Sequence, residues 1–284
     1  MANGGKPMAA KAVFFTGATG DLGSLCAKAL SETGSWTVFA AGTNEVKLAE
    51  LGKLKNVIPV KVDIRSQESV LAARERVLRQ TDKLDAIVNF AGLTAFTSMV
   101  EGDCIETTEQ LLAVNVMGTV RINRVFFDLV YAGHGRIINC SSEAGWMTSQ
   151  PFVAPYFLSK RAIEAYNDSL RRELMYISVP VIKIQPGSFD TSMTRGVFDK
   201  FDATLRDTKY YEKVLTRMKR LMEWELNQRQ NPARLVRVVL CALEAKHPKL
   251  NYRVGTSKLL ALMELLPDKC LDKLYLLIVN WQKT

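Results

Sequence analysis

The sequence predicts an α/β protein built on a doubly wound parallel sheet. Short, almost wholly apolar segments alternate with longer segments of helical character, the pattern of a sheet covered by helices on both faces. The first apolar segment runs directly into a glycine-rich stretch, TGATGDLG, at residues 16–23. With 284 residues, 48% of them hydrophobic, the chain is long enough to bury one large core. We therefore expect a single domain over residues 11–255.

Each predicted strand is short, rich in β-branched or apolar residues and bounded by turn residues. We expect the strands at residues 12–17, 37–42, 56–63, 85–92, 135–142, 179–187 and 251–254. We expect the helices between them at residues 22–33, 44–51, 66–80, 105–130, 153–177 and 232–245. A stretch at about 188–230, rich in charged, aromatic and methionine residues, interrupts this alternation and predicts a helical lid.

The two ends of the chain differ from the domain between them. Residues 1–10, MANGGKPMAA, are small and polar and predict a disordered N-terminal tail. Residues 256–284 carry apolar side chains at helical spacing and predict an apolar helical C-terminal tail. Two interpretations of this tail remain open. It packs over a pocket or against another subunit, or it lies at a membrane surface.

Cysteine and histidine usage predicts a reducing compartment and no metal site. The five cysteines are scattered without a CxxC spacing, which fits free thiols in the cytosol. His134 and His247 stand far apart, and no cluster of metal-ligating residues is present. No apolar run approaches the roughly 18 residues of a membrane-spanning helix. We expect a cytoplasmic protein, with membrane association depending on the C-terminal tail.

The formal net charge of +9 indicates an anionic partner. Nucleic acid, an anionic membrane surface and an anionic cofactor or substrate would each fit. The sequence contains no helix-turn-helix, zinc finger or aromatic RNA-binding motif, so we do not expect nucleic-acid binding.

The stretch TGATGDLG follows the first predicted strand and opens the first predicted helix. Gly17, Gly20 and Gly23 permit a tight turn, and the helix N-terminus supplies N–H groups that bind phosphate. This context predicts a dinucleotide-binding turn. Asp21 is unexpected there, because its carboxylate would repel a pyrophosphate. Acidic residues are favourable in a first helical turn, so we expect the Asp21 side chain to turn away from the ligand.

The segment PYFLSK at residues 155–160 carries a possible acid/base pair. Tyr156 and Lys160 are four residues apart and therefore share one face of a helix. A neighbouring ammonium group favours the phenolate and lowers the tyrosine pKa from about 10, which suits proton transfer near neutral pH. A pair of this kind taken alone is more often only a packing contact, so its meaning depends on the other motifs.

Taken together, the motifs resemble those of the short-chain dehydrogenase/reductase family. The resemblance runs from about residue 11 to residue 255 and includes the glycine turn. The other motifs follow in the family's order: NFAG (89–92), VNVMG (114–118), NCSSEAG (139–145), YFLSK (156–160) and PGSFDT (186–191). It implies a Rossmann-type fold with a helical substrate lid. The chain length and Asn115 favour the classical subgroup, whereas the GxxGxxG spacing is commoner in the extended subgroup.

The resemblance implies a catalytic set of four residues. Tyr156 would be the acid/base, and Lys160 would bind the nicotinamide ribose and lower the tyrosine pKa. Ser142 would hydrogen-bond the substrate oxygen, and Asn115 would support a water relay to the lysine. Ser142 precedes Tyr156 by one position more than is usual, so we expect a bulged loop. Ser141 is the alternative serine, although its side chain should point the opposite way.

The resemblance also implies a cofactor site along the carboxyl ends of the strands. In it Asp63 would meet the adenine ring, Asn89 would stabilise the centre of the sheet, and Thr191 would hold the nicotinamide carboxamide. The implied cofactor-binding residues are Gly17, Thr19, Gly20, Asp21, Leu22, Gly23, Thr43, Asp63, Ile64, Asn89, Ala91, Gly92, Tyr156, Lys160, Pro186, Gly187 and Thr191.

The end of the second strand bears on the choice of cofactor. An acidic residue near Gly42 would select NAD, and an arginine near Thr43 would accept the 2′-phosphate of NADP, but neither is present. Thr43, Asn44 and Lys47 are available instead. We therefore expect NADP(H) to be slightly favoured over NAD(H).

These features predict an NAD(P)-dependent alcohol dehydrogenase or carbonyl reductase. The lid is rich in apolar and aromatic residues such as Met193, Phe198 and Trp224, which favours a small hydrophobic substrate such as a steroid-, retinoid- or lipid-like carbonyl compound. The family's habit implies a homodimer or homotetramer. Two alternatives remain. Asp21 and the serine spacing would suit a catalytically weak dinucleotide-binding scaffold or redox sensor, and the GxxGxxG spacing would suit an extended-type epimerase or dehydratase.

Overall fold

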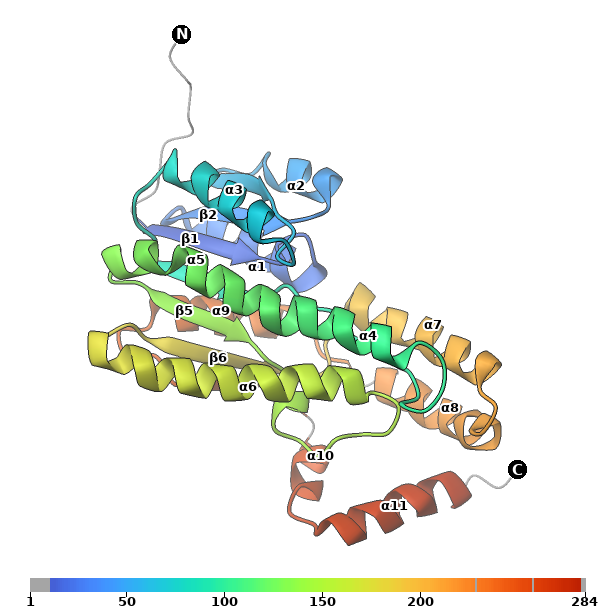
Figure 1. The fold of residues 1–284 in the computed structure, drawn as a ribbon. Helices are drawn as coiled ribbons and strands as arrows, with labels where there is room; N and C mark the ends of the chain where they lie inside the picture. The colour runs from blue at the N-terminus through green and yellow to red at the C-terminus, as the bar shows by residue number, and fades with distance from the viewer. Residues whose placement is uncertain (1–10, 228, 257, 282–284) are drawn as a thin grey trace.

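The chain folds around a seven-stranded parallel sheet in a computed structural model that describes residues 11–227, 229–256 and 258–281 (Figure 1). The expected disordered tail at residues 1–10 lies outside this range. The strands are β1 (Lys11–Thr16), β2 (Trp36–Gly42), β3 (Val57–Lys61), β4 (Ala86–Asn89), β5 (Arg136–Cys140), β6 (Val181–Pro186) and β7 (Asn251–Val254). Their order is β3-β2-β1-β4-β5-β6-β7, so the direction of strand addition reverses between β1 and β4. Ligands of such sheets bind at this switch point.

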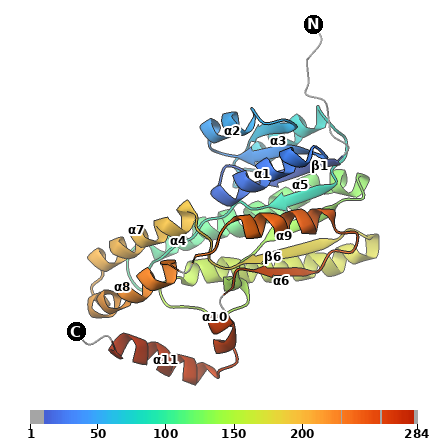
Figure 2. The same cartoon turned by 180° about the vertical axis from the view of Figure 1, so that it is seen from behind.

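Helices cover both faces of the sheet and confirm the doubly wound architecture. On one face lie α3 (Gln67–Leu78), α5 (Thr119–Ala132) and α6 (Ala154–Leu174), together with α4 (Cys104–Leu111) (Figure 1). The other face is covered by α1 (Asp21–Thr33) and α9 (Ala233–Glu244), which Figure 2 shows from behind. The short helix α2 (Glu45–Leu51) connects β2 to β3.

The first strand illustrates why the sheet is buried on both sides. Successive side chains of a strand point to opposite faces. In β1, Val13 and Phe15 therefore join the core under α1 and α9, while Phe14 joins the core under α3 and α5. The ring of Phe14 stacks on that of Phe126 from α5, with 4.1 Å between ring centroids. A strand that is apolar at every position is stable only between two layers of helices.

The predicted helix at residues 105–130 is in fact interrupted. Between α4 and α5 the residues Leu112–Gly118 form a π-helical turn, a feature frequently found at functional sites. Gly118 packs so closely on Ile64 that an added Cβ would lie 2.4 Å from the Ile64 Cδ1 atom. The wider turn brings Asn115 to the loop after β4, a tertiary contact that helical periodicity does not encode.

The stretch interpreted as a lid contains α7 (Ser192–Asp207) and α8 (Glu212–Asn227). A small apolar cluster of Phe96, Phe201, Leu215 and Met218 holds both helices on the body of the protein. Phe152, just before α6, stacks on Phe96 with 5.7 Å between ring centroids.

After β7 come α10 (Lys258–Met263) and α11 (Asp268–Trp281), at the edge of the molecule beside α8 (Figures 1 and 2). Within the described ranges, no helix combines the length and the apolar character needed to cross a membrane.

Candidate active site

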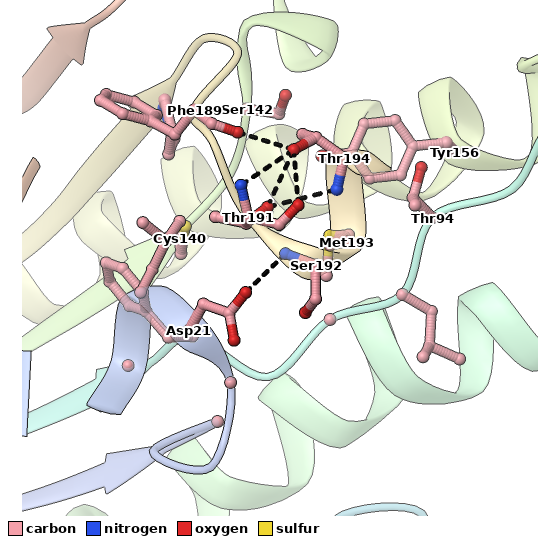
Figure 3. Close-up of a pocket in the computed structure, with 18 of the residues that line it drawn as sticks. Asp21, Thr94, Cys140, Ser142, Tyr156, Phe189, Thr191, Ser192, Met193 and Thr194 are labelled. Atoms are coloured by element: carbon pink, nitrogen blue, oxygen red, sulfur yellow. Dashed lines mark hydrogen bonds between the residues drawn. The ribbon is translucent and has the colours of Figure 1, made fainter. Parts of the chain in front are cut away.

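A cavity of about 450 Å³ lies where the carboxyl ends of the central strands meet the start of α7 (Figure 3). Many residues predicted for the site share its wall, although they come from five separate motifs of the chain. The structure brings together Gly17, Gly20, Asp21, Leu22, Gly23, Gly92, Ser142, Tyr156, Lys160, Pro186, Gly187 and Thr191.

The glycine turn between β1 and α1 is shaped by two close backbone contacts. Gly17 has φ +71°, and a Cβ there would lie 2.5 Å from the backbone nitrogen of Ala91. A Cβ on Gly23 would lie 2.1 Å from the carbonyl oxygen of Gly17. Only glycine satisfies both constraints. The resulting bare turn opens a helix N-terminus towards the cavity, so these residues fit the phosphates of a dinucleotide.

Tyr156 and Lys160 lie on the first two turns of α6 and face the cavity together. The Nζ atom of Lys160 is 5.6 Å from the centroid of the Tyr156 ring and donates a 3.2 Å hydrogen bond to the carbonyl oxygen of Cys140. Lys160 is only 6% exposed, so its ammonium group is shielded from water and held at the end of β5. The ammonium group of Lys160 is therefore fixed beside the phenol ring of Tyr156.

Asn115 lies behind this pair and outside the lining of the cavity. Its Oδ1 atom accepts a 2.7 Å hydrogen bond from the backbone N–H of Leu93, and its Nδ2 atom donates to the Leu93 carbonyl oxygen at 3.0 Å. The same Nδ2 atom donates to Ser159 Oγ at 2.9 Å, and Ser159 donates to the Tyr156 carbonyl oxygen at 2.8 Å. Asn115 therefore joins the loop after β4 to the turn of α6 that carries Tyr156.

Both candidate serines lie at the cavity, directly after β5. Ser142 caps a short 3₁₀ turn at Glu143–Gly145, and its Oγ atom accepts a 3.2 Å hydrogen bond from the N–H of Ala144. This turn accommodates the extra residue between Ser142 and Tyr156. Ser141 Oγ is buried without a hydrogen-bond partner among the described residues, and it packs against Gly145. The hydroxyl proton of Ser142 is not used by its capping bond and can be donated to a substrate oxygen.

Thr191 starts α7 and shapes the opposite wall of the cavity. Its Oγ1 atom accepts a 3.2 Å hydrogen bond from the N–H of Thr194, whose hydroxyl donates to the carbonyl oxygen of Phe189 at 2.7 Å. The backbone N–H of Thr191 in turn donates to Thr194 Oγ1 at 3.1 Å, and this reciprocal cap fixes the point at which the chain enters the helix.

The prediction that Asp21 turns away from the site is wrong. Its side chain lines the cavity, and its Oδ2 atom accepts a 2.5 Å hydrogen bond from the backbone N–H of Ser192 (Figure 3). That bond lowers the pKa of Asp21 below its ordinary value of 3.8, helped by the nearby charges of Lys47 and Arg195. The helix N-terminus of α7 attracts the carboxylate, a tertiary contact that a rule about the first turn of α1 could not anticipate.

The remaining predicted residues lie outside the lining of this cavity, as the described residues define it. Thr19 packs against Gly42, Ile64 packs against Gly118, and Thr43 is exposed in the loop after β2. Asp63 is held by Arg65, whose NH2 atom lies 2.7 Å from its Oδ2 atom. Ala91 packs against the glycine turn, and Asn89 donates to the buried side chains of Asn123 and Asn139 at the centre of the sheet.

This geometry agrees with comparisons to known proteins. The short chain dehydrogenase family model matches residues 11–201, more than half of the chain. The chain belongs to the short-chain dehydrogenase family. It is 31% identical to retinol dehydrogenase 16 of Homo sapiens over 277 residues, which cover 92% of this chain and 86% of that protein. It is 30% identical to 17-beta-hydroxysteroid dehydrogenase type 6 of Bos taurus over 291 residues, 96% of this chain and 89% of that protein.

Solved structures show the same fold. A short chain dehydrogenase from Burkholderia cenocepacia in complex with NADP superposes with a TM-score of 0.73 and 25% identity, covering 94% of this chain and 98% of that one. A short chain dehydrogenase/reductase from Burkholderia phymatum in complex with NAD superposes with a TM-score of 0.72 and 20% identity, covering 94% and 96%. The short-chain dehydrogenase described here is thus an oxidoreductase of the alcohol dehydrogenase type that uses a nicotinamide dinucleotide.

Several residues of the dehydrogenase's cavity were not singled out from the sequence. Most of them lie within the motifs or shortly after them in the chain: Phe90, Leu93, Thr94, Cys140, Phe189, Ser192, Thr194, Gly196 and Lys200. Phe90 and Phe189 stand inside NFAG and PGSFDT, so their place in those motifs was the available signal. No motif in the sequence pointed to Lys200. It reaches the site because α7 places it next to the carbonyl oxygen of Thr94, to which it donates a hydrogen bond.

Proposed function

We propose that this dehydrogenase interconverts a hydrophobic alcohol and its carbonyl compound, with a steroid-, retinoid- or lipid-like skeleton. The observation that best supports this proposal is that one cavity presents both polar groups and apolar surface. Tyr156, Lys160 and Ser142 present polar groups, while Phe90, Leu93, Phe189 and Met193 add apolar surface nearby. An apolar pocket with a few convergent polar groups is typical of a small-molecule site. Relatives named for retinol and hydroxysteroids support this substrate class.

In this proposal each polar residue has one task. The nicotinamide supplies or accepts the hydride, and the protein supplies orientation and proton transfer. Tyr156 gives its proton to the carbonyl oxygen during reduction and takes a proton from the alcohol during oxidation. Lys160 holds its ammonium group beside the Tyr156 ring and would bind the nicotinamide ribose, and the Ser142 hydroxyl orients the substrate oxygen. Asn115 fixes the backbone of α6 and of the loop after β4, so that these groups are held in place before the substrate arrives.

For the cofactor, the proposal is a modest preference for NADP(H). No acidic residue ends β2, and Lys47 lies near the site, with its Nζ atom 3.8 Å from Asp21 Oδ1. Asn44 uses its Oδ1 atom to cap α2 and keeps its amide N–H groups for a ligand. A lysine gives a flexible point charge rather than the two-pronged contact of arginine, so the preference should be small.

Thr43→Asp tests this preference by introducing the missing carboxylate. We expect the ratio of NADPH to NADH affinity to fall, because the new charge repels the 2′-phosphate and accepts a hydrogen bond from a ribose 2′-hydroxyl. Fluorescence titration with both cofactors measures the change, with Thr43→Asn as the neutral control. Tighter NADH than NADPH binding by the unsubstituted protein would contradict the preference itself.

We also propose a cytoplasmic, homo-oligomeric enzyme whose C-terminal tail contacts the body of the protein and also exposes apolar side chains. Glu264 accepts hydrogen bonds from Thr148, which lies in the loop between Ser142 and Tyr156. Leu262, Leu265 and Leu277 are more than 60% exposed. A second subunit or a membrane surface would cover these leucines. Sedimentation and flotation with liposomes distinguish the two.

The proposal is tested by following cofactor absorbance with a panel of hydrophobic alcohols and ketones of graded size. We expect turnover with steroid- or retinoid-like compounds and little with sugars. Cofactor binding without turnover on any member would favour a catalytically weak scaffold. Epimerisation or dehydration without net cofactor oxidation would favour an extended-type enzyme.

A further inference from the structure

The carboxylate of Asp21 joins two elements that face each other across the cavity. Asp21 belongs to the glycine turn, and its Oδ2 atom accepts the N–H of Ser192, the first residue of α7 (Figure 3). Two cations approach the same carboxylate. The Nζ atom of Lys47 lies 3.8 Å from Oδ1, and the NH2 atom of Arg195 lies 4.0 Å from Oδ2 while its NH1 atom donates to Asp190 at 2.8 Å. The Asp21 carboxylate thus lies close to the N-terminus of α7 and to two basic side chains, one from α2 and one from α7.

These groups are the ones that attract a phosphate. The N-terminus of a helix carries unpaired N–H groups and partial positive charge, and it binds phosphate and carboxylate by the same contacts. Helix α7 has 16 residues, so its dipole is well developed. The Thr191 cap satisfies the N–H of Thr194, whereas the N–H of Ser192 depends on Asp21.

The position of Asp21 means that its contact with α7 also bears on cofactor binding. It stands among the glycines that fit the dinucleotide phosphates, and its side chain is only 29% exposed. A carboxylate in that place repels an entering phosphate and already uses donors that the phosphate would use. The same carboxylate stabilises the lid position seen here. The Asp21 carboxylate, which attaches α7, and a phosphate of the cofactor would therefore bind the same cationic groups.

We propose that Asp21 is a latch for the lid, which holds α7 against the glycine turn in the cofactor-free enzyme and yields to a phosphate of the dinucleotide. One anion replaces another at the N-terminus of α7, so the lid stays attached while the cofactor enters. The cost of displacing Asp21 lowers cofactor affinity, which makes Asp21 a residue that sets the binding constant rather than a catalytic residue. The inference rests on nicotinamide dinucleotide binding and not on the identity of the alcohol.

Two substitutions separate the latch from an ordinary structural role. Asp21→Ala removes the carboxylate and keeps α1 helical, because alanine is a strong helix former. Ser192→Pro removes the N–H donor at the first position of a helix, where proline is well tolerated. The preceding Thr191 has φ −142° and ψ 162°, an extended conformation that proline accepts. Asp128→Ala is the matched control, because it removes a carboxylate from the surface pair with Arg74 on α3.

The experiment measures hydrogen exchange of residues 192–207 without cofactor, and NADPH affinity by fluorescence titration without substrate. We expect Asp21→Ala and Ser192→Pro both to speed exchange in α7. Asp21→Ala should bind NADPH roughly three- to tenfold more tightly, since a repulsive charge is lost. Ser192→Pro should show no such gain, because the phosphate loses the same donor. Asp21→Asn should lie between wild type and Asp21→Ala, and Asp128→Ala should match wild type in both measurements.

Two outcomes would overturn the latch. If Asp21→Ala left the exchange of α7 unchanged, the contact with Ser192 would not hold the lid. If Asp21→Ala loosened α7 without tightening NADPH, Asp21 would be a simple tether with no competition for the cofactor. If the wild type bound no dinucleotide, the nicotinamide dinucleotide binding on which the inference rests would be absent. The titration of the wild type alone detects this outcome, so it is distinguished from a failure of the latch.

Discussion

Tyr156 and Lys160 meet because one turn of helix separates them, and the chemistry of the site depends on that spacing. Lys160 is fixed by the Cys140 carbonyl oxygen, so its charge stays beside the phenol. We expect Tyr156→Phe to lower turnover by about 10²–10⁴-fold, the usual contribution of general acid–base catalysis. Cofactor affinity should be almost unchanged, since only one hydroxyl is removed.

Steady-state turnover and NADPH fluorescence measure the two effects on the same preparation. The matched control is Tyr176→Phe, a residue that is 81% exposed and remote from the cavity lining. Turnover of Tyr156→Phe equal to that of the control would refute the proposed acid/base.

The cysteines give a second test at this scale, independent of catalysis. Burial raises the pKa of Cys26 to about 12, so its thiolate fraction is negligible at pH 8. Cys241 and Cys270 are exposed and free. A maleimide added to the native protein at pH 8 should therefore label Cys241 and Cys270 while leaving Cys26 unmodified, as read by peptide mass spectrometry. Rapid labelling of Cys26 before unfolding would contradict the packing under α1.

At the scale of elements, the π-helical turn before α5 decides how the site is held together. It carries Asn115, whose amide bonds both backbone groups of Leu93 and the hydroxyl of Ser159. Asn115→Asp keeps the shape but loses the two donated hydrogen bonds. Because Asn115 and Ser159 are buried, we expect the free energy of unfolding to fall by about 1–3 kcal/mol.

Urea denaturation measures this loss, and Asn231→Asp serves as a control, since Asn231 is exposed just before α9 and its Oδ1 atom, which aspartate retains, accepts the N–H of Ala233. Activity of Asn115→Asp should fall more than its stability suggests, because Ser159 supports the turn that holds Tyr156. Stability equal to that of wild type would mean that the turn does not clamp the loop after β4.

At the scale of the whole molecule, the C-terminal helices couple the periphery to the substrate side of the site. Glu264 accepts a hydrogen bond from Thr148 in the loop between Ser142 and Tyr156. Leu271 of α11 is buried. Deleting residues 256–284 should therefore weaken substrate binding and alter assembly or solubility while leaving cofactor affinity nearly unchanged.

The deletion is checked by KM for the best substrate, by sedimentation and by NADPH titration, with Glu264→Gln as a milder variant that removes only the charge. A truncated protein that lost the cofactor first would place the tail in the nucleotide-binding core. That result would leave the substrate proposal unaffected, because the panel assay of the full chain tests it separately.

Much of the architecture follows from local sequence patterns. Apolar strands alternating with helices predict the doubly wound sheet, and the comparisons confirm the family that the ordered motifs resemble. The helical spacing of Tyr156 and Lys160 places them on one face because a regular helix repeats every 3.6 residues. These features depend on periodicity and on short-range geometry, which a single sequence contains.

What only the tertiary structure decided lies between segments far apart in the chain. The carboxylate of Asp21 reaches α7, 171 residues away, and Glu264 reaches Thr148 across 116 residues. The π-helical turn at Leu112–Gly118 likewise depends on Gly118 meeting Ile64 and on Asn115 meeting Leu93. Local propensity favours an acid in the first turn of α1 but does not specify its partner. The partner is chosen by which N–H and which cations the folded sheet brings within reach, and those positions exist only after the core has packed.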